Sequence, residues 1–186
     1  MSAIPKRKIF TVAEYHKMID AGVFAGTDRF ELIEGEIIKK MTIGDYHASC
    51  VNRLTRIFSR ECGDEVILSV QNPVVISEIS EPEPDVTLLK FQDDYYASGK
   101  ASAEDVLLLI EVSDTTVRYD RQTKVRLYAE AEVAEVWLVN LPRQILEVYS
   151  EPQGGKYKIT EKYEKKQIVS PKLLPEIKIK VSDITG

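Results

Sequence analysis

Two carboxylates and one lysine stand where short apolar segments begin or end. Asp85 opens an apolar segment, Glu111 closes the apolar run Val106–Ile110, and Lys124 lies in the helix predicted after it. Carboxylates that converge at strand ends form an all-oxygen site suited to Mg²⁺ or Mn²⁺. A divalent cation there polarises a phosphoryl oxygen and lowers the pKa of a water molecule, and a nearby ammonium group offsets charge that builds on phosphorus. The three residues therefore indicate metal-assisted phosphoryl chemistry.

Each of the three residues also has a purely structural interpretation. Asp85 follows a proline, which is typical of a turn, and Glu111 could be the first solvated residue after a buried strand. Lys124 has Asp120 one turn earlier, at a spacing that allows an ion pair within one helix. On the residue pattern alone, the structural and the chemical interpretations both stand.

The elements that must position these residues form a strand–helix–strand unit. Val106–Ile110 and Glu135–Val139 are continuous apolar runs, which is typical of strands covered on both faces. The helix between them is predicted over Val117–Ala131, and its face that carries Lys124 also carries apolar residues. A lysine on an inward face needs an anionic partner, which the strand-end carboxylates could supply. Such a unit predicts parallel strands with a right-handed crossover.

The other segments predict further strands and helices around one central mixed sheet. A capping box at Thr11 and Glu14 predicts a short helix. The tail from Ile145 alternates apolar and polar residues, which predicts an antiparallel meander of short strands. The remaining predicted segments are a helix over 11–21, strands over 29–33 and 35–40, a helix over 45–62, and strands over 65–70, 73–76 and 85–89.

The predicted helix over 45–62 carries an apolar stripe and, roughly opposite to it, a row of three arginines. Arg53, Arg56 and Arg60 recur at spacings of three and four residues. A row of this kind is able to meet phosphate groups, although a solvated arginine face is the commoner case. Trp137, within the buried run, is predicted to be a core residue rather than a base-stacking platform.

Composition favours a single globular domain over residues 1–186, with residues 1–9 as a flexible N-terminal segment. The net charge of −5 argues against a protein that acts mainly by non-specific attraction to phosphates. No apolar run approaches the ~20 residues of a membrane span. Cys50 and Cys62 are predicted on one helix, about 18 Å apart, which excludes a disulfide there. We therefore expect a cytoplasmic protein without membrane contact.

Several stretches, taken in order, resemble the Uma family of endonuclease-like proteins within the PD-(D/E)XK superfamily. The resemblance spans about Ile9 to Ile184. Each stretch is unspecific alone, but their order and spacing together are specific. The matching stretches are 30–37 (FELIEGEI), His47 at a helix start, 83–86 (EPDV), 109–113 (LIEVS), 120–124 (DRQTK) with Tyr128, 135–139 (EVWLV), 174–177 (LPEI) and 181–184 (VSDI).

The resemblance implies a restriction-endonuclease-like α/β fold, a central mixed sheet flanked by helices, and a role for each site residue. Asp85, Glu111 and the Val112 carbonyl would hold Mg²⁺ or Mn²⁺. Ser113 stands where the superfamily's usual lysine would be, so Lys124 in the next helix would assist the attacking water.

The resemblance also assigns supporting residues. Glu31 would be the additional acid, and it matches the family pattern better than Glu34. Asp120 would orient Lys124, and His47 would support the site or close the edge of the core. Asn140 stands where relatives commonly have an aspartate, a change expected to affect a turn.

The expected activity is metal-dependent hydrolysis of phosphodiester bonds in nucleic acid, with DNA as the expected substrate. The superfamily often acts as dimers, because cutting two strands calls for two sites, so a homodimer is expected. The main alternative is a catalytically silent binding or regulatory module that keeps the fold. A third interpretation is a hydrolase of a small phosphoester, which an enclosed pocket would favour.

Overall fold

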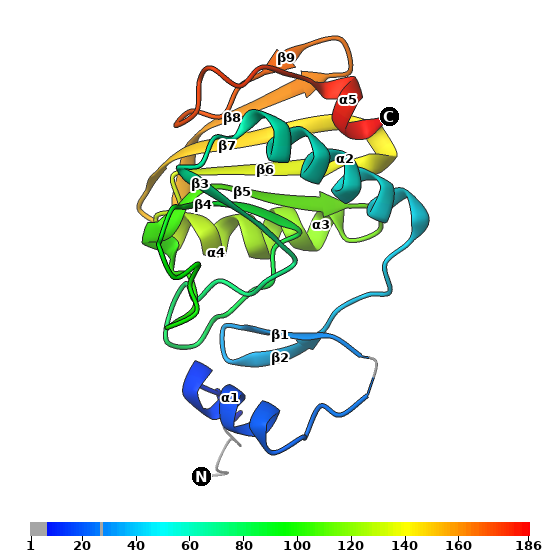
Figure 1. Ribbon diagram of the computed structural model, residues 1–186. Coiled ribbons are helices and arrows are strands. Elements are labelled where there is room, and N and C mark those ends of the chain that lie inside the picture. The colour runs from blue at the N-terminus through cyan, green and yellow to red at the C-terminus, as the bar shows by residue number, and fades with distance from the viewer. Residues whose placement is uncertain (1–6, 27) are drawn as a thin grey trace.

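A six-stranded mixed sheet forms the body of the protein in the computed structural model, which describes residues 7–26 and 28–186 (Figure 1). The strand order is β3-β4-β5-β6-β7-β8, and only β5 and β6 of these neighbours run parallel. The strands are β3 (Val66–Val70), β4 (Val86–Lys90), β5 (Val106–Ser113), β6 (Glu135–Asn140), β7 (Ile145–Gln153) and β8 (Lys156–Glu164).

The predicted strand–helix–strand unit is confirmed, but its helix contains an irregular turn. β5 and β6 pair in parallel with Glu111 opposite Leu138. The helix that joins them consists of α3 (Val117–Tyr119), a π-helical turn η2 (Asp120–Lys124) and α4 (Val125–Glu130). In the π turn, the amide of Val125 donates to the carbonyl of Asp120, five residues earlier. Such turns are rare and occur frequently at functional sites.

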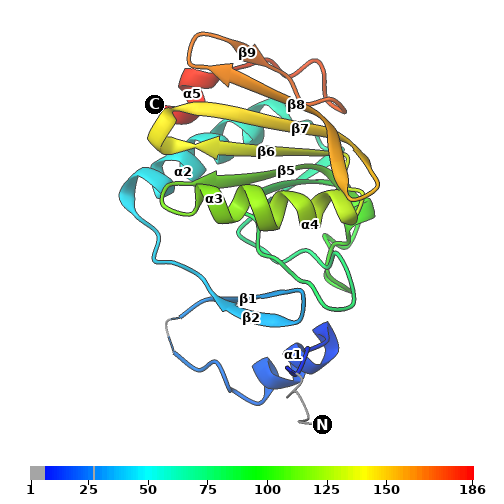
Figure 2. The same ribbon diagram turned by 180° about the vertical axis from the view of Figure 1, so that it is seen from behind.

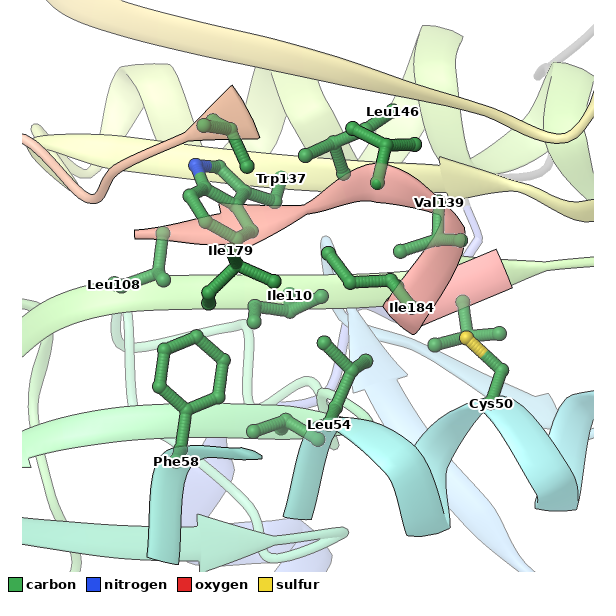
Figure 3. Close-up of a cluster of buried hydrophobic side chains, with 14 of the residues drawn as sticks. Cys50, Leu54, Phe58, Leu108, Ile110, Trp137, Val139, Leu146, Ile179 and Ile184 are labelled. Carbon is green, nitrogen blue, oxygen red and sulfur yellow. The ribbon is translucent and has the colours of Figure 1, made fainter. Parts of the chain in front are cut away.

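Helices cover both faces of the sheet (Figures 1 and 2). On one face, α2 (Asp45–Glu61) and α5 (Val181–Thr185) pack on a core that includes Phe58, Ile110 and Trp137 (Figure 3). Trp137 is fully buried, so its predicted place in the core is confirmed. On the other face, α4 packs through Val125 and Tyr128 against Val136 and Leu138. Both faces of β5 and β6 are thus buried, as their continuous apolar sequences predict.

An N-terminal unit lies beside the sheet and does not join it (Figure 1). It contains α1 (Val12–Asp20), with the predicted capping box at Thr11 and Glu14, and the hairpin of β1 (Phe30–Ile33) and β2 (Glu36–Lys39). Leu32 forms a β-bridge with Glu81 in the loop between β3 and β4. The buried carboxylate of Glu81 pairs with His16 of α1 and with Lys100. These contacts fix the hairpin relative to the sheet.

Two predicted segments differ from the structure. Residues 73–76 were expected as a strand but form a loop, because successive amides bond to different partners: Val74 to the Pro82 carbonyl and Val75 to the Ala101 carbonyl. The tail does not consist only of short strands, since β7 and β8 form a hairpin of nine residues each. The remaining elements are η1 (Ala103–Asp105), η3 (Leu141–Arg143), β9 (Ile168–Val169) and β10 (Ile179–Lys180).

The described part of the chain has no helix long and apolar enough to cross a membrane. Both cysteines carry free thiols, with Cys50 buried in α2 and Cys62 at its end. The N-terminal segment that was predicted as flexible lies largely outside the described residues. Of its described part, Arg7 pairs with Glu36 and Lys8 with Glu14.

Candidate active site

A cavity of about 490 Å³ lies at the end of β5, between the sheet and the N-terminal hairpin. Its walls come from the hairpin and its exit, the start of α2, the end of β5 and the π turn. All four residues predicted as catalytic line this cavity, together with Val112: Glu31, Asp85, Glu111 and Lys124. Segments up to about 90 residues apart in sequence thus meet at one site.

Asp85 stands directly before β4, and three donors hold its carboxylate. Oδ2 accepts hydrogen bonds from the Val112 amide at 2.9 Å and from His47 Nε2 at 3.0 Å, and Oδ1 accepts one from Gln71 Nε2 at 3.2 Å. Burial alone would raise the pKa of Asp85, but the bonds from His47 and Val112 hold it below its usual value. Burial would lower the pKa of His47, and Asp85 outweighs this and raises it. Asp85 is therefore ionised and fixed in orientation.

Lys124 joins the two glutamates at the centre of the cavity. Its Nζ lies 2.9 Å from Glu31 Oε2 and 3.1 Å from Glu111 Oε1. The Tyr128 hydroxyl also donates to Glu111 Oε1, at 2.5 Å. Burial raises the pKa of Glu111 to about 7, although Lys124 opposes this shift. Burial would lower the pKa of Lys124, but Glu111 and Glu31 outweigh it and raise that pKa, so the lysine stays charged.

Asp120 has different partners from those expected. Its Oδ2 accepts hydrogen bonds from the hydroxyls of Ser113 and Thr116, both at 2.5 Å. The Ser113 hydroxyl thereby links the end of β5 to the helix. The ammonium group of Lys124 pairs with the two glutamates instead of with Asp120. Asp120 contributes to the raised pKa of Lys124 through its charge, without a direct hydrogen bond.

Glu34 lies outside the cavity, in contrast to Glu31. It occupies the β1–β2 turn with φ of 49° and pairs with Arg126 at the surface. Glu34 lies beyond the end of β1, so strand alternation does not set its direction, and its ion pair with Arg126 holds it away from the cavity that Glu31 lines. The structure thus brings Glu31 to the site and Glu34 to solvent.

Four residues of the site were not predicted from the sequence: Lys40, Gln71 and Tyr119, which line the cavity, and Tyr128, which donates to Glu111. Lys40 donates to the Glu83 carbonyl at 2.7 Å, and burial together with the charge of Lys124 lowers its pKa. Tyr128 belongs to the stretches that resemble the Uma family, without a predicted role. The other three lie in loops or at element ends, where no periodic pattern distinguishes them from surface residues.

Two polar atoms in this cavity have no partner within the protein. Of the side chains that the structure describes, only His47 Nδ1 and the Tyr119 hydroxyl are buried without a hydrogen bond. Both residues line the cavity. Burial raises the pKa of Tyr119 to about 12, so its hydroxyl keeps its proton. Buried polar atoms normally have partners, so these two are available to a ligand.

The donor set of the cavity fits a hard divalent cation. Five carboxylates line it, together with the ammonium groups of three lysines: Glu31, Asp85, Glu111, Asp114 and Asp120, with Lys39, Lys40 and Lys124. No cluster of three or more metal-binding His, Cys, Asp or Glu side chains occurs within residues 7–26 and 28–186. Mg²⁺ commonly uses one or two carboxylates and keeps several waters, so two acids with a backbone carbonyl are sufficient.

The arginine row of α2 lies outside this cavity. All three side chains are exposed, and Arg53 alone of the three borders a second cavity, of about 670 Å³. Arg56 and Arg60 line neither of these two cavities. The row follows the surface of α2 away from the carboxylates, so only its first member lies near the site.

Comparison with known proteins identifies the family. The family model described as "Uma2: Putative restriction endonuclease" matches residues 12–182. The chain belongs to the Uma2 family. No curated protein matches the chain. The membership confirms the resemblance to the Uma proteins that the sequence motifs carried.

The fold of this Uma2 member is also similar to a crystal structure, described as that of a putative nuclease belonging to DUF820 from Anabaena variabilis. The TM-score is 0.71 at 16% identity, over 95% of this chain and 97% of the other. At this identity the likeness concerns the fold alone. The predicted architecture, an α/β fold with a central mixed sheet flanked by helices, is confirmed.

Proposed function

We propose that this Uma2 protein is a metal-dependent endonuclease that hydrolyses phosphodiester bonds in nucleic acid, with DNA as the expected substrate. The observation that carries the proposal is the position of Lys124, which bridges Glu31 and Glu111 in the cavity that Asp85 also lines. A purely structural domain has no need to bury two carboxylates and a lysine beside a third carboxylate, since burying charges is costly. The description of the family model, "Putative restriction endonuclease", supports the same activity.

In this proposal the acids hold the ion, and the other groups position the substrate. Asp85, Glu111 and the carbonyl of Val112 would hold Mg²⁺ or Mn²⁺. The ion would supply polarisation of a phosphoryl oxygen and a lower pKa for a water molecule. His47 and Gln71 hold Asp85 in the orientation that the site needs. Glu31 lies within reach of Lys124 and completes the acidic wall.

Lys124 carries the charge that the reaction needs near phosphorus. Its ammonium group would orient the attacking water and offset the negative charge that develops in the transition state. Tyr128 and Lys124 both donate to Glu111 Oε1, so the carboxylate is held on one side by protein donors. The hydroxyl of Tyr119, protonated and without a protein partner, is available to donate to a phosphate oxygen.

The test is cleavage of supercoiled and linear DNA with Mg²⁺ or Mn²⁺. Wild type would be compared with Asp85→Ala and Lys124→Ala, and with Asp93→Ala and Lys162→Ala as controls at exposed positions. We expect cleavage that requires the metal, is lost in both site variants and is retained in both controls. Loss in Asp85→Ala alone would overturn the role of Lys124.

Absence of both cleavage and metal binding in well-folded wild type would contradict the enzyme proposal. That outcome would favour the silent binding module instead. Cleavage of small phosphoesters but not of nucleic acid would favour the third interpretation. The homodimer implied by the resemblance stays a prediction, which sedimentation analysis of the protein in solution tests.

A further inference from the structure

The second cavity lies directly beside the candidate active site. Asp114, just after β5, lines both cavities. The residues at the start of α2 are divided between the two cavities. Gly44 and His47 line the first cavity, and Asp45 and Tyr46 line the second. The two cavities are therefore neighbours across the first turn of α2. A chain molecule with one phosphate at the carboxylates would extend into the second cavity.

The walls of the second cavity suit a nucleobase better than they suit a row of phosphates. Tyr46 is 81% exposed although it is a large aromatic residue, and Leu141 and Pro142 add apolar surface. An exposed ring is a platform on which a base of any sequence stacks. The carboxylates of Asp45 and Asp114 would repel phosphate but accept hydrogen bonds from the amino group of a base.

Arg53 is the cation of this cavity. It projects from α2 two turns after Tyr46 and is exposed. A guanidinium group binds phosphate oxygens through paired hydrogen bonds. One aromatic face, two acceptors and one arginine match a single nucleotide with its phosphate.

A base must be free of its duplex neighbours to use this arrangement. Within a duplex both faces of a base are covered by stacking, so neither is open to Tyr46. The four residues proposed for catalysis, Glu31, Asp85, Glu111 and Lys124, are at most 5% exposed, so the reacting phosphate must enter below the surface. A flexible, unpaired strand does so more easily than a rigid duplex.

We propose that the second cavity binds an unpaired nucleobase next to the scissile phosphate, with the ring of Tyr46 stacked on the base and Arg53 on a flanking phosphate. This inference rests on the proposed nuclease function and adds the form of the substrate: nucleic acid that is single-stranded at the cleavage point. Tyr46 is a binding residue in this account and takes no part in the chemistry.

Binding of a fluorescent oligonucleotide tests the proposal separately from cleavage. The probe is a short single strand with 2-aminopurine at alternate positions, whose fluorescence decreases when the base stacks on an aromatic ring. Titrations with EDTA prevent cleavage, and the same strand annealed to its complement is the comparison. The variants are Tyr46→Ala, Tyr46→Phe and, as a control, Tyr95→Ala, another exposed tyrosine that lines neither cavity.

We expect quenching and tighter binding for the single strand than for the duplex. Tyr46→Ala should lose the quenching and weaken binding by roughly tenfold or more, the effect of one lost base–aromatic stack. Tyr46→Phe should bind as wild type does, because the ring is kept, and Tyr95→Ala should be unchanged. Equal binding by Tyr46→Ala and wild type, or tighter binding of the duplex, would overturn the proposal.

The two proposals can fail independently. Quenching that depends on Tyr46, without any cleavage when Mg²⁺ is added, would support the base-binding cavity and contradict the enzyme. Metal-dependent cleavage that is the same in wild type and Tyr46→Ala would support the enzyme and contradict the base-binding cavity. Absence of binding by both strand forms overturns the base-binding cavity outright.

Discussion

Glu111 is the acid of the site whose charge depends most on its surroundings. Burial raises its pKa to about 7 in the protein without metal, from an ordinary value of 4.5. Metal binding requires the ionised carboxylate, so below pH 7 a proton competes with the ion. Because the folded-state pKa is raised, the competition grows as the pH falls through about 7 and disappears well above it.

The pKa of Glu111 predicts a pH-dependent affinity for Mg²⁺. We expect the affinity to fall by up to about tenfold for each pH unit below 7 and to be constant at alkaline pH. Titration calorimetry at several pH values measures this directly. Glu111→Gln should bind more weakly and lose this dependence. Constant affinity of wild type from about pH 6 to 8 would contradict the assignment of Glu111 as a ligand.

Lys124 should matter for stability as well as for chemistry. Replacing it by methionine leaves Glu31 and Glu111 buried without their shared cation, which we expect to lower the free energy of unfolding by about 3–5 kcal/mol. Lys162→Met, at an exposed position of β8, should change it by no more than about 0.5 kcal/mol. Urea unfolding in EDTA gives both values, and equal effects of the two substitutions would refute the buried ion pairs.

The π turn contains Asp120 and Lys124, the two buried charged residues of this helix. It adds one residue to the helix relative to a regular α-helix, which rotates the part after it by about 100°. Both residues are at most 6% exposed, and Tyr128 after the turn reaches Glu111. The helix thus contributes site residues from its π turn and core residues from α4, which follows the turn.

Deletion of Gln122 tests the role of this turn. Gln122 is exposed, and its side-chain oxygen accepts a hydrogen bond from Arg118 on the same helix. Removing it should convert the π turn to regular α-helix. Either Lys124 or the core residues of α4 would then rotate away from their present contacts. We expect cleavage to be lost and the melting temperature to fall, whereas Gln122→Ala keeps both. Full activity after the deletion would show that the turn does not position Lys124.

Features with a local sequence pattern could be predicted, and features that arise from tertiary packing could not. The buried strands, α2 and the capping box have periodic or motif signals, and Asp85, Glu111 and Lys124 follow from motif order, so these could be predicted. The π turn could not, since residues spaced by four share a face in a regular helix as well. Gln71 and Tyr119 reach the cavity through tertiary packing, for which the sequence has no periodic signal.

At the scale of the whole molecule, charge is arranged so that nucleic acid would be bound locally. The net charge is −5, and the exposed arginines of α2 extend away from the acidic cavity. Contacts with phosphate should therefore be few, and binding should depend weakly on salt. We expect Arg53→Ala to weaken binding of a single strand and Arg60→Ala to leave it unchanged, by fluorescence anisotropy. Equal losses in both variants would instead indicate a continuous basic surface along α2.

The central claim is that the carboxylates around Lys124 form a metal-dependent phosphodiesterase site. The most direct measurement is single-turnover cleavage of DNA with Mg²⁺ by wild type, Glu111→Gln and Glu135→Gln. Glu135 is a matched control, because it is a buried glutamate on β6 that bonds to Trp137 and does not line the cavity. The account predicts cleavage by wild type and Glu135→Gln, and a rate at least about a hundredfold lower for Glu111→Gln. Equal rates for Glu111→Gln and wild type would contradict it.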